Sequence, residues 1–390
     1  MPGPWLRLTA LAAAAGTLLA VISGAAGLDT AHRLLAALTV PPLAALVVAG
    51  WVAHRRLLKP SLLALVLFGG AALLVGRDLH VALAALAFAA TLLVAVEAHR
   101  GAPASSGPWR DYLTLTKPRI MSLLLLTGFC GMVVGAGGWP GTGLAAAAMG
   151  GLALACGGAS ALNHVLDRDI DRLMGKRTER RPVAAGRVPP ARALEFGLAL
   201  SAFSFVLLAS TVNVLTAALA LVGNLFYVLV YTRWLKRSTP QNIVIGGAAG
   251  AVPPLVGWAA ATGSLSLPAV WLFLIVFLWT PPHFWALALL IREDYAAARI
   301  PMLPVVRGER ETARQVVWYS LALVAATLLP FLWHSAGLAY LASAVALGVV
   351  LLALAVGLVR TTSRRRASQL FHFSLLYLAL LFVAMALGQI

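Results

Sequence analysis

The segment from Asn163 to Pro182 reads NHVLDRDIDRLMGKRTERRP and comes directly after a long apolar run at about 142–162. Asn163, Asp167 and Asp171 are spaced four residues apart, so on a helix they lie roughly along one face. Only 13 of the 390 residues are Asp or Glu, yet three Asp occur within five positions here. Ionisable groups at membrane depth are costly and usually functional, so this segment predicts a site at the mouth of a membrane bundle.

A dense group of cations follows these acids. It consists of Arg172, Lys176, Arg177, Arg180 and Arg181. Magnesium favours one or two carboxylates together with phosphate oxygens of a substrate, and Lys and Arg take the remaining phosphate charge. The pattern therefore predicts a site for a magnesium-bound diphosphate. A helix end that snorkels into a basic loop would explain the Arg residues but not the acids.

The composition is that of a polytopic helical membrane protein. The chain is 61% hydrophobic and 11% charged, and its mean hydropathy is +0.89. A net charge of +17 would indicate nucleic acid binding in a soluble protein. Here the cations gather in short loops between apolar runs, so the expected partner is the lipid bilayer and not nucleic acid. Cys130 and Cys156 lie in apolar segments and indicate neither a disulfide nor a metal site.

A window of about 20 apolar residues for each span predicts roughly thirteen transmembrane helices, an all-α fold. We expect a four-helix membrane bundle in residues 1–100, a linker at 101–109 and nine further spans in 110–390. The first apolar run is long for a signal peptide, so we interpret it as a spanning helix. The predicted spans lie near 5–27, 31–53, 60–76, 79–98, 119–138, 142–165, 191–211, 213–234, 241–262, 267–291, 313–334, 337–359 and 369–388.

The basic loops all fall on one side of these spans. By the positive-inside rule this side is the cytoplasm, with the N-terminus inside and the C-terminus outside. The chain begins without an Arg/Ser-rich transit peptide, which favours a bacterial cytoplasmic membrane with the site on its cytoplasmic face. The loops concerned lie near 54–56, 172–187, 233–237, 292–314 and 360–366.

Two further polar stretches share this face, at 231–242 and 279–302. The helix after the first contains Gly246, Gly247, Pro253 and Pro254, and we expect it to be thin and kinked. Simple helix packing explains its glycines equally well. In the second stretch, we expect Glu293 and Asp294 to supply further metal or diphosphate contacts opposite Asp167 and Asp171. His283, beside Pro281 and Pro282, either packs as a core polar residue or lines a substrate cavity.

Taken together, six motifs at these positions form a specific combination over about 110–390. They are Thr116-Lys117-Pro118-Arg119, the Asn163–Asp171 run with Lys176-Arg177-Thr178 and Arg181-Pro182, Tyr231-Thr232 through Lys236-Arg237, Asn242–Gly247, Trp279–Trp285 and Arg292–Tyr295. This combination resembles the UbiA superfamily of intramembrane prenyltransferases and, within it, the branch of protoheme IX farnesyltransferases. Many superfamily members carry a second Asp-x-x-x-Asp run, whereas this chain has only Glu293-Asp294, which leaves the ligands of a second metal open.

The resemblance implies a nine-helix bundle that transfers a farnesyl group from farnesyl diphosphate to a vinyl group of haem b, with water adding to give haem O. It implies catalytic roles for Asn163, Asp167, Asp171, Glu293 and Asp294, with Mg²⁺ held by Asp167, Asp171 and Asp294. The diphosphate would be bound by Lys117, Arg119, Lys176, Arg177, Arg181, Lys236, Arg237 and Arg292. The haem and prenyl cavity would be lined by Tyr231, Asn242, Trp258, His283, Phe284, Trp285 and Tyr295.

Two other interpretations stay open. A member of the same superfamily could act on another acceptor, such as a quinone precursor or chlorophyllide, because cavity shape sets substrate choice. A haem-binding or transport protein is the alternative from a different class, but a transporter is expected to place polar residues near the midplane, and here the charges cluster at one face.

The first 100 residues contain a weak internal repeat around His32 and His80, preceded by Asp29 and Asp78. This part resembles one half of a haem A synthase, an enzyme that consumes haem O. The resemblance implies that His32 and His80 ligate a haem b in the four-helix bundle and that haem A synthase is a partner. Two interfacial histidines at helix starts are an equally good interpretation.

Overall fold

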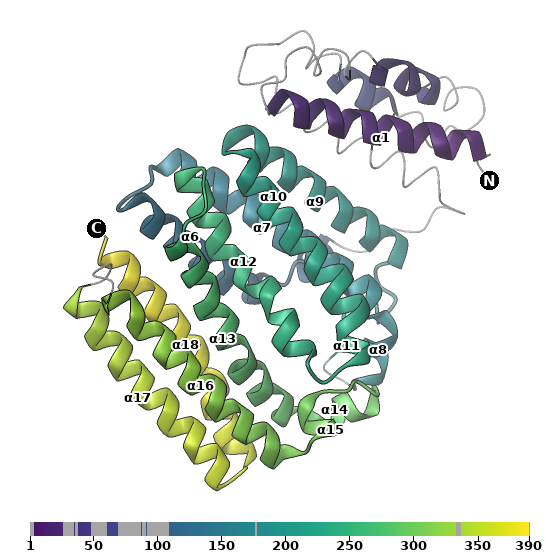
Figure 1. Ribbon diagram of the computed structural model, residues 1–390. Helices are drawn as coiled ribbons and strands as arrows, with labels where there is room; N and C mark the ends of the chain where they lie inside the picture. The colour runs from purple at the N-terminus through teal and green to yellow at the C-terminus, as the bar shows by residue number, and fades with distance from the viewer. Residues whose placement is uncertain are drawn as a thin grey trace.

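The computed structural model describes residues 4–25, 35, 38–47, 61–68, 87, 91, 109–175, 178–332 and 337–389. Within these ranges the regular structure is entirely helical, and no strand occurs (Figure 1). This confirms the all-α fold expected from composition.

Nine helices in the described ranges are long and apolar enough to cross a membrane, by length and composition. They match the nine spans predicted for 110–390, with ends that differ by a few residues. Eight of them are α6 (Pro118–Ala136), α7 (Thr142–Leu166), α9 (Pro190–Thr211), α12 (Asn242–Thr262), α13 (Leu267–Leu290), α16 (Glu309–Leu332), α17 (Leu338–Arg360) and α18 (Arg364–Leu387). The ninth combines α10 (Val214–Leu225), the π-helix η1 (Phe226–Leu235) and α11 (Lys236–Ser238).

These helices pack side by side, with α12 and α13 in contact near the middle of the array (Figure 1). Helix α12 contacts α6, α7, α10 and α13, and α18 packs on α6, α13 and α17. Without a hydrophobic driving force in lipid, small residues let helices approach closely. A Cβ added at Gly131 of α6 would stand 2.7 Å from the backbone oxygen of Pro254, and one added at Gly257 would overlap the carbonyl of Gly128.

Both helices with proline pairs run continuously through them. Pro253 and Pro254 lie inside α12, and Pro281 and Pro282 lie inside α13. Gly247 of α12 faces Thr280 of α13, where an added Cβ would stand 2.9 Å from the Thr280 methyl group. Gly246, Gly247 and Gly257 of α12 thus serve close helix packing, which was the simpler of the two expectations, whereas Gly250 has no close neighbour.

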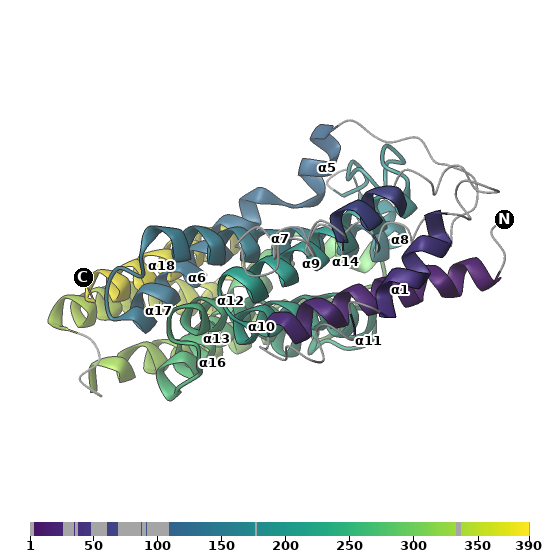
Figure 2. The same ribbon diagram turned by 90° about the horizontal axis from the view of Figure 1, so that it is seen from above.

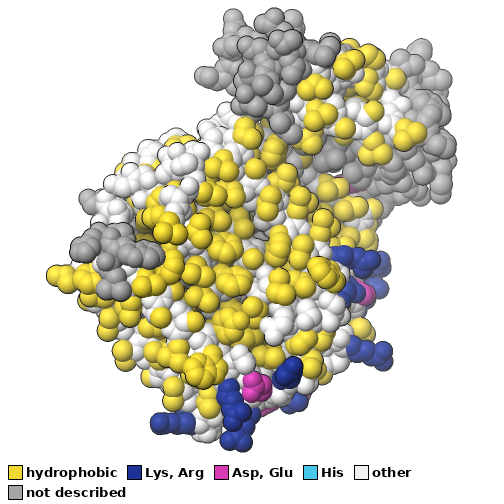
Figure 3. Space-filling view, in the orientation of Figure 1, with side chains coloured by type: hydrophobic (Ala, Val, Ile, Leu, Met, Phe, Trp, Pro, Cys, Tyr) yellow, Lys and Arg dark blue, Asp and Glu magenta, His cyan; other side chains and the backbone are white. Residues whose placement is uncertain are grey.

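Short helices gather at one end of the bundle. They are α5 (Trp109–Leu115), α8 (Arg168–Leu173), α14 (Arg292–Ala297) and α15 (Leu303–Val306). In Figures 1 and 2, α8, α11 and α14 lie at this end. The Lys and Arg side chains gather at the same end in Figure 3, and hydrophobic side chains cover the face between it and the opposite end. The one-sided charge expected from the loops is therefore present in the structure.

Part of the N-terminal region is described. Helix α1 (Pro4–Ala25) packs Leu18 against Ala202 and Val206 of α9, and residues 38–47 and 61–68 are helical. His32 and His80 lie outside the described residues, as does most of the linker at 101–109. The four-helix bundle and the domain boundaries therefore stay predictions.

Candidate active site

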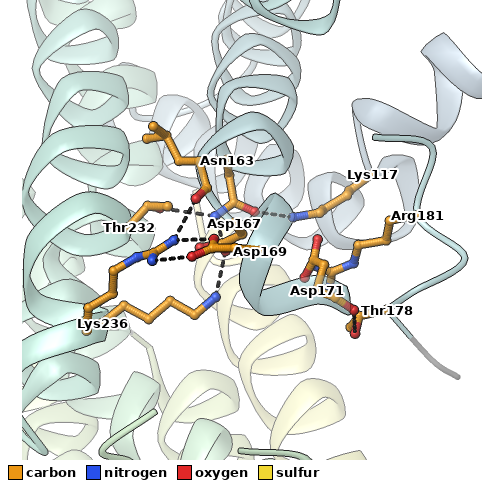
Figure 4. Close-up of polar contacts among 11 residues, drawn as sticks. Lys117, Asn163, Asp167, Asp169, Asp171, Thr178, Arg181, Thr232 and Lys236 are labelled. Carbon is orange, nitrogen blue, oxygen red and sulfur yellow. Dashed lines mark hydrogen bonds and ion pairs between the residues drawn. The ribbon is translucent and has the colours of Figure 1, made fainter. Parts of the chain in front are cut away.

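The carboxylates of the Asn163–Asp171 run lie where α7 turns into α8 (Figure 4). Asp167 ends α7, and its backbone N–H donates to the Asn163 carbonyl at 2.9 Å. The N–H of Asp171 in turn donates to the Asp167 carbonyl at 2.8 Å. The helical hydrogen-bond pattern between residues four apart therefore continues from α7 into α8. Asp167 and Asp171 are 1% and 0% exposed, which is exceptional for carboxylates at a chain corner.

Asn163 connects three elements of the site. Its Oδ1 accepts a hydrogen bond of 2.8 Å from the Lys117 ammonium, just before α6. Its Nδ2 donates to Asp167 Oδ2 at 2.8 Å and to the Thr232 hydroxyl at 3.1 Å. The amide therefore fixes Lys117 and Asp167 relative to each other, with all its contacts buried or half-buried.

Each buried carboxylate is paired with one cation. Lys236 Nζ lies 2.6 Å from Asp167 Oδ2, and Arg181 lies 2.6 Å from Asp171 Oδ1. The Thr178 hydroxyl donates to the Asp171 backbone carbonyl at 2.7 Å, which holds the loop that carries Arg181. In Figure 4, Thr232 and Lys236 approach from one side of the corner and Arg181 from the other.

The second oxygen of each carboxylate has no hydrogen-bond partner in the part of the chain that the structure describes. Asp167 Oδ1 and Asp171 Oδ2 are buried and accept no hydrogen bond from the described residues. Burial raises the pKa of Asp171, and the positive charge of Arg181 opposes that rise. Two unpaired anionic oxygens on adjacent helical turns are ligands of the kind that Mg²⁺ prefers. The residues present thus fit a divalent cation.

Lys117 is held in an unusual backbone conformation. Its φ of 51° and ψ of 60° are left-handed, a conformation that costs free energy in a non-glycine residue. Pro118 follows it and disfavours the ordinary helical conformation at position 117. Burial, and then repulsion by Arg181, lower the pKa of its ammonium from 10.5 to about 7. A bound anion would raise the pKa of Lys117 again and so favour its protonated, positively charged form.

Arg237 lies on the outer side of the corner. It forms a two-pronged ion pair with Asp169, at 2.7 Å for both bonds, and donates to the Leu166 carbonyl at 2.7 Å. The hydrogen bonds that Arg237 donates to Asp169 lower the pKa of the Asp169 carboxyl to about 2. Its neighbour Lys236 points to Asp167 instead, so the two adjacent cations have different partners. A diphosphate-binding role for Arg237 stays a prediction.

The second acidic stretch approaches the same site from α14. Asp294 is half-buried, and its Oδ1 lies 3.6 Å from where a Cβ of Gly175 would stand, in the loop after α8. Glu293 is exposed. In the described part of the chain, no three His, Cys, Asp or Glu side chains come close enough to form a metal site by themselves. Asp294 therefore does not complete a protein-only cage with Asp167 and Asp171.

Tyr295, next to these acids, is buried, and this burial raises its pKa to about 12. The charges of Arg181, Asp167 and Asp294 act on it in that order, which places the ring within electrostatic range of both acidic segments. Arg292 pairs with Glu309 at 3.2 Å and lines a cleft of about 250 Å³ with Glu293 and Asp294.

His283 lies in a packed aromatic cluster between α13 and α18. Its ring stacks on Trp279 at 4.4 Å and on Phe371 at 4.7 Å, and its Nδ1 is 2.8 Å from the Ser374 hydroxyl. Phe284 meets the His283 ring edge-on at 5.5 Å. This packing agrees with the interpretation of His283 as a core polar residue, and a place in the substrate cavity stays a prediction.

Three other predicted cavity residues carry a buried polar atom without a partner among the described residues. Asn242 donates to the Thr239 carbonyl at 2.6 Å, but its Oδ1 accepts nothing. The indole N–H groups of Trp258 and Trp285 are also unpaired. Such atoms are rare in folded proteins and are candidates for contacts with a ligand or water.

The remaining predicted residues are only partly placed. Arg119 is exposed at the start of α6, and Lys176 and Arg177 lie outside the described residues. Sequence reasoning included Thr178 and Thr232 in its motifs but gave them no role, whereas their hydroxyls support the carboxylate corner. Thr232 stands four residues before Lys236, a spacing that could have indicated a shared helix face.

Comparisons with known proteins agree with this geometry. The sequence model of the UbiA prenyltransferase family matches residues 124–384. The protoheme IX farnesyltransferase of Symbiobacterium thermophilum is 57% identical over 280 residues, which cover 71% of this chain and 93% of that protein. The protoheme IX farnesyltransferase of Thermus thermophilus is 53% identical over 292 residues, 75% of this chain. The matched region is only 47% of the Thermus protein, so this chain spans about half of that relative's length.

Solved structures show the same fold at low sequence identity. A digeranylgeranylglyceryl phosphate synthase superposes with a TM-score of 0.61 at 18% identity, over 72% of this chain and 98% of that one. A UbiA homologue from Archaeoglobus fulgidus, bound to GPP and Mg²⁺, gives a TM-score of 0.53 at 18% identity, over 70% of this chain and 99% of that one. With nine apolar helices among the described residues alone, the chain is a multi-pass integral membrane protein and belongs to the UbiA prenyltransferase family.

Proposed function

We propose that the chain transfers a farnesyl group from farnesyl diphosphate to a vinyl group of haem b, with addition of water, and so makes haem O. Relatives that are 50–57% identical over about 70% of the chain carry the name protoheme IX farnesyltransferase, which supports this reaction. The observation that carries it in the structure is the pair of buried carboxylates, each with one unpaired oxygen, surrounded by Lys117, Lys236 and Arg181.

The two unpaired oxygens would hold the metal. Asp167 Oδ1 and Asp171 Oδ2 are the atoms available to Mg²⁺, and the Archaeoglobus homologue with GPP and Mg²⁺ supports the choice of ion. A bound Mg²⁺ supplies positive charge next to the leaving diphosphate. Asp294, across the loop at Gly175, is the candidate ligand for a second ion or for further diphosphate contacts, with Glu293 at the rim.

The cations stabilise the diphosphate as it leaves. Cleavage of the bond between the allylic carbon and oxygen concentrates negative charge on the diphosphate, and preorganised positive groups stabilise that charge. Asn163 keeps Lys117 oriented through its 2.8 Å hydrogen bond, and Lys236 is held by Asp167. These positions are set before substrate arrives, so little reorganisation accompanies the reaction.

The site would face the cytoplasm of a bacterium. The basic residues lie at the end that carries the carboxylates (Figure 3), which by the positive-inside rule is the cytoplasmic end. Residues 110–390 then form the prenyltransferase domain. Haem b ligation by His32 and His80 in residues 1–100, and contact with haem A synthase, are further parts of the proposal. An absorbance spectrum of purified protein tests the ligation, because a haem with two histidine axial ligands absorbs strongly in the visible.

The reaction is tested with the full chain in detergent, haem b, farnesyl diphosphate and Mg²⁺. We expect haem O by mass spectrometry, and its loss in Asp171→Asn. Asp169→Asn is the matched control, because Asp169 is two residues away, 64% exposed at its side chain and paired with Arg237. Prenylation of a different aromatic acceptor, with haem b untouched, would keep the family and overturn the acceptor.

A further inference from the structure

The π-helix η1 changes which residues share a face with the site. It is ten residues long, whereas π-helical geometry usually occurs as single turns and frequently at functional sites. Its hydrogen bonds join residues five apart, as shown by the N–H of Lys236, which donates to the Tyr231 carbonyl. Tyr227 and Lys236 are nine residues apart, which is two and a half turns of α-helix but close to two turns of π-helix.

In this register, two tyrosines lie beneath the polar residues of the site. Tyr227 stands five residues before Thr232, and Tyr231 five residues before Lys236. Thr232 and Lys236 contact Asn163 and Asp167, so Tyr227 lies about one turn, on the order of 5 Å, below Thr232, and Tyr231 lies about one turn below Lys236. The opposite face meets lipid, because Leu225, Leu229 and Trp234 are 47%, 56% and 63% exposed.

Contacts with two neighbouring helices place the pair inside the bundle. Tyr227 packs with Ala159 and Leu162 of α7, directly before Asn163. The Tyr231 ring lies against Gly246 of α12, where any added Cβ would overlap it. The two tyrosine rings stack with centroids 5.6 Å apart and planes 27° apart.

The two hydroxyls are the unexplained feature. Neither the Tyr227 nor the Tyr231 hydroxyl makes a hydrogen bond to a described residue, and because both side chains are only half-buried, both hydroxyl oxygens stay accessible. An accessible hydroxyl inside a membrane bundle is a candidate to bind water. Hydroxyls on two stacked rings, each able to donate and accept, supply the two polar partners that an ordered water needs.

We propose that the Tyr227 and Tyr231 hydroxyls bind the water that completes the reaction, an inference that rests on the proposed function. The farnesyl carbon–oxygen bond breaks, and its electron pair leaves with the diphosphate. The vinyl π electrons form the new carbon–carbon bond, which leaves a cation on the inner vinyl carbon. The water oxygen adds to this cation, and its released proton goes to the diphosphate. Without a positioned water, the cation instead loses a neighbouring proton to give an alkene.

The test compares products of Tyr227→Phe, Tyr231→Phe and the double variant with those of the wild type. Phenylalanine keeps both rings, so the stacking and helix packing are retained while the hydroxyls are lost. We expect haem b to be farnesylated, but with the ratio of haem O to the product lighter by one water reduced about tenfold or more. Tyr377→Phe is the matched control, because its hydroxyl meets Thr327 on another side of the bundle and should leave the ratio unchanged.

The outcomes separate the two proposals. If the wild type farnesylates no haem, the proposed function fails. If the wild type makes haem O and the double variant makes it with the same product ratio, only the water site is overturned. A double variant that retains farnesyl diphosphate binding, measured by protection from thermal unfolding, but forms no carbon–carbon bond also overturns the water site, because the water acts after that bond.

Discussion

Two corners of the bundle have similar sequences but different surroundings. At each, a membrane helix is followed by a six-residue helix with two acids in its first turn: α7 leads to α8 with Asp169 and Asp171, and α13 leads to α14 with Glu293 and Asp294. At the first corner, Asp171 is buried beside Arg181 and leaves one oxygen unpaired. At the second, Glu293 is exposed and Arg292 pairs outward with Glu309. The difference teaches that acids at a helix end present free carboxylate oxygens to a possible ligand only where burial and cations fix them in place.

The largest effect is expected from a substitution at the first corner, at Asp167. Asp167→Asn removes the charge that holds Lys236 and one of the two metal-facing oxygens, so we expect a fall in kcat of about a thousandfold. The measurement is single-turnover formation of haem O. Glu293→Gln, at the second corner, should stay within about threefold of wild type if that acid lies only at the rim. Equal losses in the two variants would contradict the contrast between the corners.

The next effect concerns the cations. Arg181→Met leaves the buried Asp171 without its partner and removes positive charge from the diphosphate, so we expect farnesyl diphosphate to bind about tenfold to a hundredfold more weakly. Arg292→Met disrupts an exposed pair and should change the Kd by less than about threefold. Titration of each purified variant with a non-reactive prenyl diphosphate analogue measures both values. If Arg292→Met had a larger Kd than Arg181→Met, then Arg292 and not Arg181 would be the main diphosphate-binding arginine.

The lowered pKa of Lys117 predicts that diphosphate binding depends on pH at the first corner. No such dependence is expected from the second corner. With a pKa lowered to about 7, its ammonium loses its charge as the pH rises above neutrality, so the Kd for the diphosphate should increase by up to about tenfold for each pH unit. Lys117→Arg keeps the charge and should flatten this profile.

Protein stability should respond in the opposite direction. The unfolded chain keeps Lys117 protonated up to about 10.5, so between pH 7 and 10.5 it binds more protons than the folded chain and the free energy of unfolding rises. Binding that weakens with pH while stability increases would identify Lys117. A parallel change in both would point to another group.

The smallest effect is expected at the exposed Asp169–Arg237 pair. Asp169→Ala should lower the free energy of unfolding by no more than about 1 kcal/mol, because a side chain that is 64% exposed is screened by water. Thermal unfolding in detergent measures this. A drop as large as that of Lys236→Ala, which strips a cation from the buried Asp167, would show that the Arg237 contact with the Leu166 carbonyl stabilises the corner.

Much of this site could be predicted from spacing. The four-residue intervals of Asn163, Asp167 and Asp171 predicted a shared face, and the hydrogen bonds from residue to residue confirm that the three lie together. The nine spans of 110–390 followed from hydropathy alone, since a bilayer sets the length of its helices. Lys117, before a proline in the Thr-Lys-Pro-Arg motif, was also expected at the diphosphate site, and it lies beside Asn163.

The separation of Lys236 from Arg237 could not be predicted in this way. Both are basic and adjacent, yet Lys236 contacts Asp167 and Arg237 contacts Asp169, and the helix that leads to them, η1, has π-helical hydrogen bonds. Hydrophobic periodicity assumes 3.6 residues per turn and contains no signal for a segment that departs from it. For the same reason Tyr227 drew no attention, although its neighbour Tyr231 did.

The seam between α6 and α12 has a mechanical consequence. Where Gly257 meets the Gly128 carbonyl, two backbones touch with no side chain between them, and Gly131 also lies against the Pro254 backbone. Side chains can change rotamer to let helices slide, but backbones in direct contact cannot, so α6 and α12 behave as one rigid body. A lipid-borne chain that enters the bundle sideways must therefore part some other pair of helices.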